Sequence, residues 1–130
     1  MADNKTSDLC PALRALVPKF IENCAFDGVT VKILVTWRDA TAQNAAKAAG
    51  LSNAAAGSSP HNCLDVQGNP ASKAFDFGVF NNGVYLTNGS DPRYAQAGAV
   101  AVALGLAWGG DWHHPDYDHV ELMNWRTATG

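Results

Sequence analysis

The hydrophobic positions of the chain change their spacing along its length, and each change predicts a different element. Over residues 9–24 apolar side chains recur as they do on one face of a helix. These apolar positions are Leu13, Leu16, Val17, Phe20 and Ile21. Pro11 suits the first turn of such a helix, whereas Pro18 is expected to break or kink it. Residues 1–8 are polar and are expected to be frayed.

Further along, β-branched runs and alanine-rich runs predict strands and short helices. Gly50 and Gly105 are placed as helix ends, and Pro92 as the first residue of a helix. Asn81-Asn82-Gly83 is typical of a turn between two strands. The predicted strands cover residues 29–36, 73–79 and 84–86, and the predicted helices cover residues 40–49 and 93–104.

Between these elements, residues 51–59 predict a loop, and the region from His61 predicts a hairpin or extended loop. The elements together predict an α+β fold, a small antiparallel sheet with packed helices. A length of 130 residues, of which 47% are hydrophobic, predicts a single domain over residues 1–130 with its own core. No separate second domain is expected.

Charge and cysteine content exclude several functions. The net charge is −3 and the nine Lys and Arg residues are scattered, so no nucleic-acid partner is expected. The three cysteines (Cys10, Cys24 and Cys63) form no CxxC pair, so neither a disulfide framework nor a zinc ribbon is indicated. Neither a signal peptide nor a membrane span is recognisable. We expect a monomer, made in a cytoplasm and without membrane insertion.

The most polar and specific stretch of the chain is WGGDWHHPDYDHVELM, residues 108–123. We expect a glycine-bearing turn, a short loop and then a strand that opens at His119. Asp116 precedes His119 by three residues, so a loop carboxylate can lean over an ion that a strand imidazole holds. Such a carboxylate can accept a proton from water activated by a metal. Trp108 and Trp112 are expected to pack and to form cleft walls.

Partners for His119 lie upstream in the strings SPHN and AFDF, which contain His61 and Asp76. Phe75 and Phe77 alternate with Asp76, so a strand would point the rings one way and the carboxylate the other. A carboxylate among apolar neighbours is costly unless it meets a cation. Two imidazoles and one carboxylate leave a fourth position open, which is typical of catalytic zinc.

These strings resemble a known family. SPHN…AFDF resembles the S-x-H-N…A-x-D-F signature of the VanY-like D-alanyl-D-alanine carboxypeptidase and L-alanyl-D-glutamate endopeptidase family, which cuts the peptide stems of bacterial cell walls. GLAWGGDW…D-x-x-H-V-E-L resembles the same family's C-terminal motif, especially in phage endolysins. The Val35-Thr36-Trp37-Arg38 segment and Gln43 resemble a further family segment, and the likeness extends from about Val31 to Leu122. It implies a LAS-type metallopeptidase fold with a zinc site at the sheet.

The resemblance implies a role for each matching residue. His61, Asp76 and His119 would be the zinc ligands, and Asp116 the general base. Arg38 would stabilise the developing oxyanion or hold a substrate carboxylate. Ser59 and Gln43 would contact substrate or support the ligands. Trp112 as a cleft wall and Glu121 on the strand face of His119 are further candidates for substrate contact or ligand support.

One departure from the family pattern concerns spacing. His61 and Asp76 are 15 positions apart, further than the family usually places them. The additional residues fall within Cys63 to Lys73, which should form a surface excursion at the rim of the cleft. A smaller departure is Trp37, which stands where the family has Tyr.

Several assignments have rivals among nearby residues. Asp65 is the rival of Asp76, while His113 and His114 are the rivals of His119. Asp118 and Glu121 are the rivals of Asp116, although Asp118 is expected to point away from the ligand beside it. Arg38 could instead pair with Asp39 or another acid. Cys63 is expected to be inert, because no activating pattern surrounds it.

The sequence thus predicts a zinc peptidase with a peptidoglycan stem peptide as its substrate. The HVEL ending favours an L-alanyl-D-glutamate endopeptidase of the phage-lysis type, made in the host cytoplasm and released to the wall or periplasm by a holin. The alternatives are a D-alanyl-D-alanine carboxypeptidase and a non-catalytic zinc-containing wall-binding or phage structural module.

Overall fold

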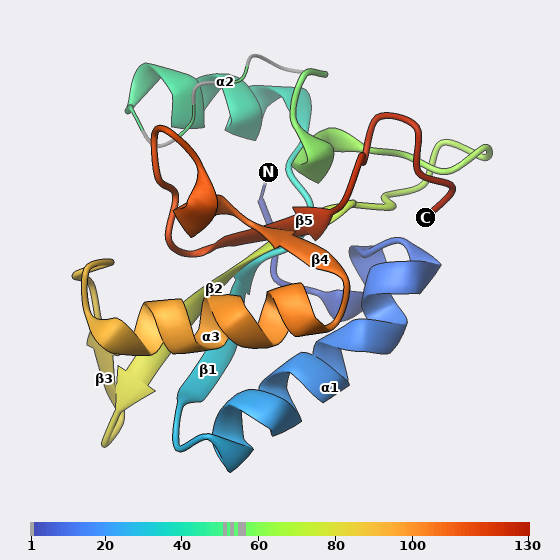
Figure 1. The fold of residues 1–130 in the computed structure, drawn as a ribbon. Helices are drawn as coiled ribbons and strands as arrows, with labels where there is room; N and C mark the ends of the chain where they lie inside the picture. The colour runs from blue at the N-terminus through green and yellow to red at the C-terminus, as the bar shows by residue number, and fades with distance from the viewer. Residues whose placement is uncertain (1, 51, 53, 55–56) are drawn as a thin grey trace.

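The computed structural model of the chain describes residues 2–50, 52, 54 and 57–130. These residues form a five-stranded antiparallel sheet in the order β1-β2-β5-β4, with β3 paired to β2 (Figure 1). The strands are β1 (Thr30–Val35), β2 (Ala74–Asn81), β3 (Val84–Leu86), β4 (Leu106–Trp108) and β5 (His119–Leu122). The helices are α1 (Pro11–Phe26), α2 (Ala40–Ala48) and α3 (Pro92–Ala103), with short 3-10 helices η1 (Thr6–Asp8), η2 (Pro60–Asn62) and η3 (Gly109–Asp111). The predicted α+β class is confirmed.

Strand β2 is the centre of the sheet, and its alternation is the one predicted. Phe75 and Phe77 point into the core, where each ring centroid lies 5.3 Å from that of Phe20 in α1. Asp76 therefore points to the opposite face. Helices α1 and α3 cover the phenylalanine face, while α2 lies on the other side of the sheet (Figure 1). The core thus occupies one face, and the other face is left for chemistry.

Strand β4 was not predicted. Trp108 pairs with Val120 of β5, whereas the sequence placed this tryptophan in a glycine-bearing turn. The strand has only three residues and runs directly into Gly109 and Gly110, so its own pattern is too short to show the period of a strand. Its pairing with β5 holds the loop that carries Asp116 against the sheet.

Helix α1 is continuous through Pro18, so the break that the sequence allowed there does not occur. A proline inside a helix costs about 3 kcal/mol, because it removes one hydrogen bond and crowds the preceding turn. Pro18 lies on the exposed side of α1. Burial of the apolar stripe on the other side offsets this cost. The stripe consists of Leu13, Val17, Phe20 and Cys24.

Residues 2–8 are tied to the chain just after β1, contrary to the expectation that they are frayed, while position 1 lies outside the described residues. The Asp3 amide donates to the Trp37 carbonyl oxygen at 3.0 Å, and the Thr36 amide donates to the Asp3 carbonyl oxygen at 2.7 Å. The Thr36 hydroxyl donates to the Asp3 carboxylate at 2.7 Å. Residues 2–8 therefore support Thr36, which contacts the functional site.

The excursion over residues 63–73 follows η2 and contains a small turn. The Asp65 carboxylate accepts hydrogen bonds from the amides of Gln67 and Asn69, both at 2.9 Å. The chain closes through a bridge between Leu64 and Pro70. Asp65 is thus occupied in its own turn, which argues against it as the rival ligand of Asp76.

The other predicted elements are confirmed with small shifts in their ends. β2 extends to Asn81, so the turn consists of Asn82 and Gly83, both with positive φ. Of the predicted loop over residues 51–59, positions 51, 53, 55 and 56 lie outside the described residues. None of the helices in the described ranges is both long and apolar enough to cross a membrane.

Candidate metal centre and catalytic cleft

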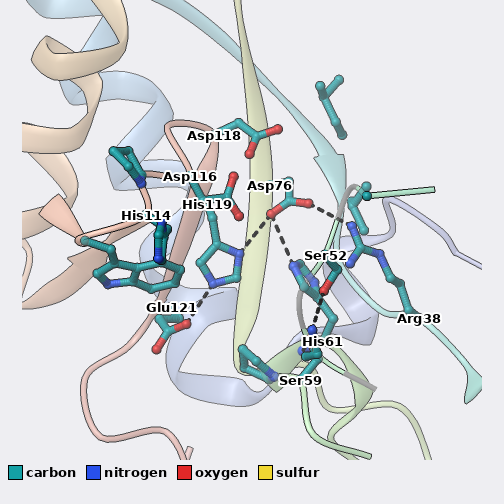
Figure 2. A pocket seen from close by; sticks show the side chains of 17 residues that line it. Arg38, Ser52, Ser59, His61, Asp76, His114, Asp116, Asp118, His119 and Glu121 are labelled. Atoms are coloured by element: carbon teal, nitrogen blue, oxygen red, sulfur yellow. Dashed lines mark hydrogen bonds and ion pairs between the residues drawn. The ribbon is translucent and has the colours of Figure 1, made fainter. Parts of the chain in front are cut away.

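The three residues predicted as metal ligands converge on the open face of the sheet. One side-chain ligand atom each from His61, Asp76 and His119 lies within 4.8 Å of the others, and all three residues are buried. Asp76 Oδ1 lies 3.2 Å from His61 Nε2 and 3.1 Å from His119 Nδ1. Figure 2 shows Asp76 at the centre, between the two imidazoles. This cluster could hold a metal ion.

Two other contacts orient the imidazoles. His61 Nδ1 donates to the Thr36 carbonyl oxygen at 2.7 Å, which leaves Nε2 facing Asp76. His119 Nε2 contacts Glu121 Oε1 at 2.8 Å, which leaves Nδ1 facing Asp76. Metal-binding histidines usually use their second nitrogen in this way, because the outer hydrogen bond fixes the ring and its tautomer. Glu121 therefore contacts His119 directly, and a supporting role for Glu121 stays a prediction.

The electrostatics of the cluster favour a cation. Burial by itself lowers the pKa of His119, but the hydrogen bonds to Asp76 and Glu121 outweigh burial and raise this pKa to about 10. Burial raises the pKa of Asp76, yet the charge of His61 and the hydrogen bonds from both imidazoles hold it well below its usual range. Carboxylates that stabilise a positive charge so strongly suit a divalent cation in the same place.

The cluster opens into a cleft of about 630 Å³. Asp116 lines this cleft from the loop before β5, and its amide donates to the Gly109 carbonyl oxygen at 2.9 Å. Trp112 also lines it, with its ring centroid 5.2 Å from that of His119. The cleft therefore combines a cluster able to bind metal with a carboxylate and an aromatic wall.

The sequence model of the D-alanyl-D-alanine carboxypeptidase family matches residues 24–122, which is most of the chain. The chain belongs to the D-alanyl-D-alanine carboxypeptidase family. The resemblance of the SPHN, AFDF and HVEL strings to VanY-like peptidases is thereby confirmed. Membership supports a peptidase that acts on peptidoglycan peptides.

A solved structure supports the fold of this peptidase. The crystal structure of Serratia marcescens L-Ala D-Glu endopeptidase ChiX matches it with a TM-score of 0.60 and 21% sequence identity. The match covers 86% of this chain and 84% of that chain. At this identity the likeness shows a shared fold. No curated protein matches the chain in sequence.

Arg38 contacts the candidate metal centre of this peptidase directly. Its guanidinium forms an ion pair with Asp76 Oδ2 at 3.1 Å, and also lies 3.4 Å from Gln43 Oε1. Gln43 is fully buried, so it supports Arg38 from behind and does not line the cleft. Its amide donates to Ser52 Oγ at 2.9 Å and to the Ala54 carbonyl oxygen at 2.7 Å. Of the two roles left open for Gln43, the supporting one fits this position.

Ser59 and Asn62 position His61. The Ser59 hydroxyl oxygen accepts from the His61 amide at 3.2 Å and so caps η2, and Ser59 also lines the cleft. The Asn62 side chain donates to the Arg38 carbonyl oxygen at 3.0 Å, while the Arg38 amide donates to the His61 carbonyl oxygen at 3.0 Å. Asn62 belongs to the SPHN string, but no pattern in the sequence indicated this role. Through it, the segments that carry His61 and Arg38 are fixed to each other.

Asp118 does not point away from the site, which corrects the sequence-based expectation. Its side chain lines the cleft and lies near Asp116 and Asp76 (Figure 2). Burial, a hydrogen bond with Asp116 and the charge of Asp76 together raise the pKa of Asp118 to about 8. The residue precedes β5, and strand alternation does not fix the direction of a loop side chain. Two carboxylates therefore lie above Asp76, where only Asp116 was expected.

The excursion over 63–73 does not form the rim of the cleft, contrary to expectation. The described residues that line the cleft come from β1 and Arg38 just after it, the segment at 50–61, β2, and the loop before β5 with β5 itself. His114 is among them and His113 is not, although both side chains are exposed. The bridge that closes the excursion folds it back on itself.

We predict that Cys63 takes no part in catalysis. Burial raises the pKa of its thiol, and the residue does not line the cleft. A thiol that stays protonated is a weak nucleophile and a weak metal ligand. Cys63→Ala should keep turnover on cell wall within about twofold and leave metal content unchanged, because the substitution removes no catalytic group. Loss of metal from this variant would contradict the prediction.

We predict that Gly109 is required for the position of Asp116. A Cβ at Gly109 would overlap the Asp116 carbonyl oxygen, which is backbone and cannot turn aside. Gly109→Ala should lower the free energy of unfolding by about 1–3 kcal/mol, the usual cost of overpacking. Denaturant unfolding measures the change, with Asp111→Ala as an exposed control in the same turn. Equal stability of the two variants would show that the loop relaxes freely.

Proposed function

We propose that this chain is a zinc-dependent peptidoglycan endopeptidase that cleaves the L-alanyl-D-glutamate bond of stem peptides. The observation that carries the proposal is the convergence of His61, Asp76 and His119 within 4.8 Å in a cleft also lined by Asp116. The choice of bond is supported by the fold shared with a protein described as an L-Ala D-Glu endopeptidase, and by the HVEL string.

The donor set fits zinc. Two imidazole nitrogens and one carboxylate are borderline ligands that leave one coordination position for water or substrate, as in catalytic zinc sites. The outer contacts to Thr36 and Glu121 supply the orientation that such ligands need. When bound, Zn²⁺ would polarise the scissile carbonyl and lower the pKa of water.

The chain's own residues supply the proton transfers and part of the charge stabilisation. Asp116 accepts the proton of the attacking water and then passes it to the amine that leaves. Arg38 keeps its positive charge throughout, and the guanidinium groups that line such clefts can bind a developing oxyanion or a substrate carboxylate. The pairing with Asp76 holds the guanidinium beside the reacting centre. Trp112 forms a wall that shields His119 from bulk water.

Product analysis of digested wall tests the function. Purified peptidoglycan is incubated with the protein, and new termini are identified by mass spectrometry. The proposal expects new N-terminal glutamate and new C-terminal alanine on the sugar-linked fragment. Wall that binds the protein but shows no new termini would instead indicate a non-catalytic wall-binding or phage structural module.

A second candidate function is a D-alanyl-D-alanine carboxypeptidase, which the description of the matched family favours. Such an enzyme needs a cation for the terminal carboxylate of its substrate, and Arg38 lines the cleft. The same experiment separates the two activities, because the carboxypeptidase releases free D-alanine and creates no N-terminal glutamate.

We also propose a setting in phage lysis, in which a holin releases the protein from the host cytoplasm to the wall. The resemblance of the C-terminal motif to phage endolysins supports it. Expression in a bacterial host should leave cells intact until a holin is co-expressed, and should then cause lysis. Lysis that begins equally early without the holin would contradict this setting.

A further inference from the structure

The open face of the sheet continues beyond the metal centre as an apolar surface. Along β2, Asp76, Gly78 and Phe80 share this face, because alternate residues of a strand point the same way. Tyr85 of β3 is paired with Phe80, and Lys32 of β1 is paired with Gly78, so both lie on the same face. A strip of side chains thus leads from the metal centre along the sheet.

This strip forms a platform that we define as Leu34, Gly78, Phe80 and Tyr85. A Cβ at Gly78 would come 2.8 Å from the Tyr85 ring and 2.9 Å from the Leu34 side chain. The absence of a side chain at Gly78 therefore lets Tyr85 and Leu34 pack directly over the strand. The rings of Phe80 and Tyr85 stack with their centroids 5.3 Å apart, and Lys32 Nζ lies 4.5 Å from the Phe80 centroid. Tyr85 remains 42% exposed despite these neighbours. An aromatic side chain is thus fixed in place with part of its surface open to solvent.

The platform is continuous with the catalytic cleft. Leu34 lines the cleft, and Tyr85 lines an adjoining hollow of about 220 Å³. The two spaces share Pro115, Asp116 and Asp118 as walls. A substrate bound in the cleft can therefore extend over the platform without leaving the protein surface.

The chemistry of the platform suits a sugar better than an extended peptide. A sugar ring has an apolar face that packs on an aromatic ring, and its hydroxyl groups can form hydrogen bonds with the Asp118 carboxyl group or the Thr87 hydroxyl. An extended peptide is usually bound through the backbone of an unpaired strand edge. Here β2 is hydrogen bonded on both sides, to β1 and to β5 and β3, so its backbone beneath Gly78 and Phe80 is not available to a peptide. Leu34 and Tyr85 contribute their side chains from the outer strands β1 and β3.

We propose that this platform binds the N-acetylmuramic acid end of the glycan to which the stem peptide is attached; the proposal rests on the endopeptidase function above. From Asp76 to Gly78 the strand rises about 7 Å. One residue and the lactyl linker separate the L-alanyl-D-glutamate bond from the sugar, which is also about 7 Å when extended. The D-alanyl-D-alanine bond is three residues further from the sugar, about 10 Å more. The platform therefore matches a bond close to the glycan.

Two matched substrates test the proposal. One is the free stem peptide, and the other is the same peptide on an N-acetylglucosamine–N-acetylmuramic acid disaccharide. The wild-type protein should show a kcat/KM about tenfold higher for the sugar-linked peptide than for the free peptide, mainly through a lower KM. A tenfold difference corresponds to one well-packed contact with an aromatic ring. Tyr85→Ala should reduce this ratio toward one, while Tyr85→Phe should preserve it. Val84→Ala is the matched control, because Val84 is the exposed neighbour in β3 that points to the other face.

Direct binding supplies a readout that does not depend on catalysis or on the stability of the variants. The peptide-free disaccharide is titrated into the metal-free wild-type protein and followed by NMR. The proposal expects shifts at Tyr85, Gly78 and Leu34. Shifts elsewhere, or none at millimolar disaccharide, would overturn it.

The outcomes separate the platform from the proposed function. Equal cleavage of the two substrates by the wild type would overturn the platform and leave the endopeptidase intact. Equal slowing of both substrates by Tyr85→Ala would show that the platform holds peptide and would also overturn the proposal. Failure to cleave either substrate would reject the endopeptidase function, and the disaccharide titration would then decide the platform by itself.

Discussion

Replacing Asp116 with asparagine is expected to reduce turnover on purified cell wall by about 10²–10⁴-fold, the usual contribution of a general base. The amide keeps the size of the side chain but cannot accept the proton of the attacking water. Asp116 lines the cleft and lies outside the cluster of His61, Asp76 and His119, so the variant should keep its metal. Initial rates of wall digestion and metal content by mass spectrometry are measured on the same preparation.

Two further variants make the test of Asp116 specific. Asp111→Asn is the matched control, because Asp111 is an exposed acid at the start of the same loop and does not line the cleft. Asp118→Asn addresses the carboxyl group that hydrogen bonds with Asp116. We expect a smaller loss for Asp118→Asn than for Asp116→Asn. If only Asp118→Asn abolished turnover, the base would have been assigned to the wrong residue.

Removal of the metal is expected to bring wall digestion below detection, and added Zn²⁺ should restore it. The reason is that the chain places two imidazoles and a carboxylate at one point, where a divalent cation supplies the charge that the reaction needs. Incubation with a chelator, dialysis and titration with Zn²⁺ measure the effect. Activity should return in proportion to bound metal, up to one ion per chain, as the single described cluster implies. Digestion that persists in chelator would reject the metallopeptidase mechanism.

A ligand variant connects this result to the proposed site. His61→Ala should lose both bound metal and activity, because one of three protein ligands is gone. His113→Ala is the control, since His113 is exposed and does not line the cleft. Equal metal content in the two variants would place the ion elsewhere in the protein.

Most strands and helices were predicted correctly from the local spacing of hydrophobic and polar residues. The alternation of Phe75, Asp76 and Phe77 predicted both the strand and the direction of its carboxylate, because the period of a strand is a property of the strand alone. Pro18 was misjudged because the cost of a proline in a helix is local, whereas the burial of Phe20 against β2 that offsets it is tertiary. β4 was missed because three residues hold too little pattern, and its pairing with β5 comes from a distant segment.

Some residues of the candidate site were likewise predicted from the sequence, and others were identified only from the structure. His61, Asp76 and His119 were found from their strings, and the structure brings them together. Thr36 and Asn62 were not assigned roles, because their contacts run through backbone atoms that a motif does not reveal. The direction of Asp118 was predicted wrongly, since a loop side chain follows the packing of the loop rather than a strand period. The excursion over residues 63–73 was predicted at the cleft rim because the sequence shows its length but not the bridge that closes it.

The sequence by itself determined which side chains are available for chemistry, in which order they occur, and which of them share a face of a strand. It did so because side-chain type and strand or helix period depend on residues close together in the chain. Only the tertiary structure decided which imidazole nitrogen faces Asp76, that Arg38 pairs with this carboxylate, and that the platform at Tyr85 joins the cleft. These arrangements depend on the packing of segments that lie far apart in sequence, and no local period encodes that packing.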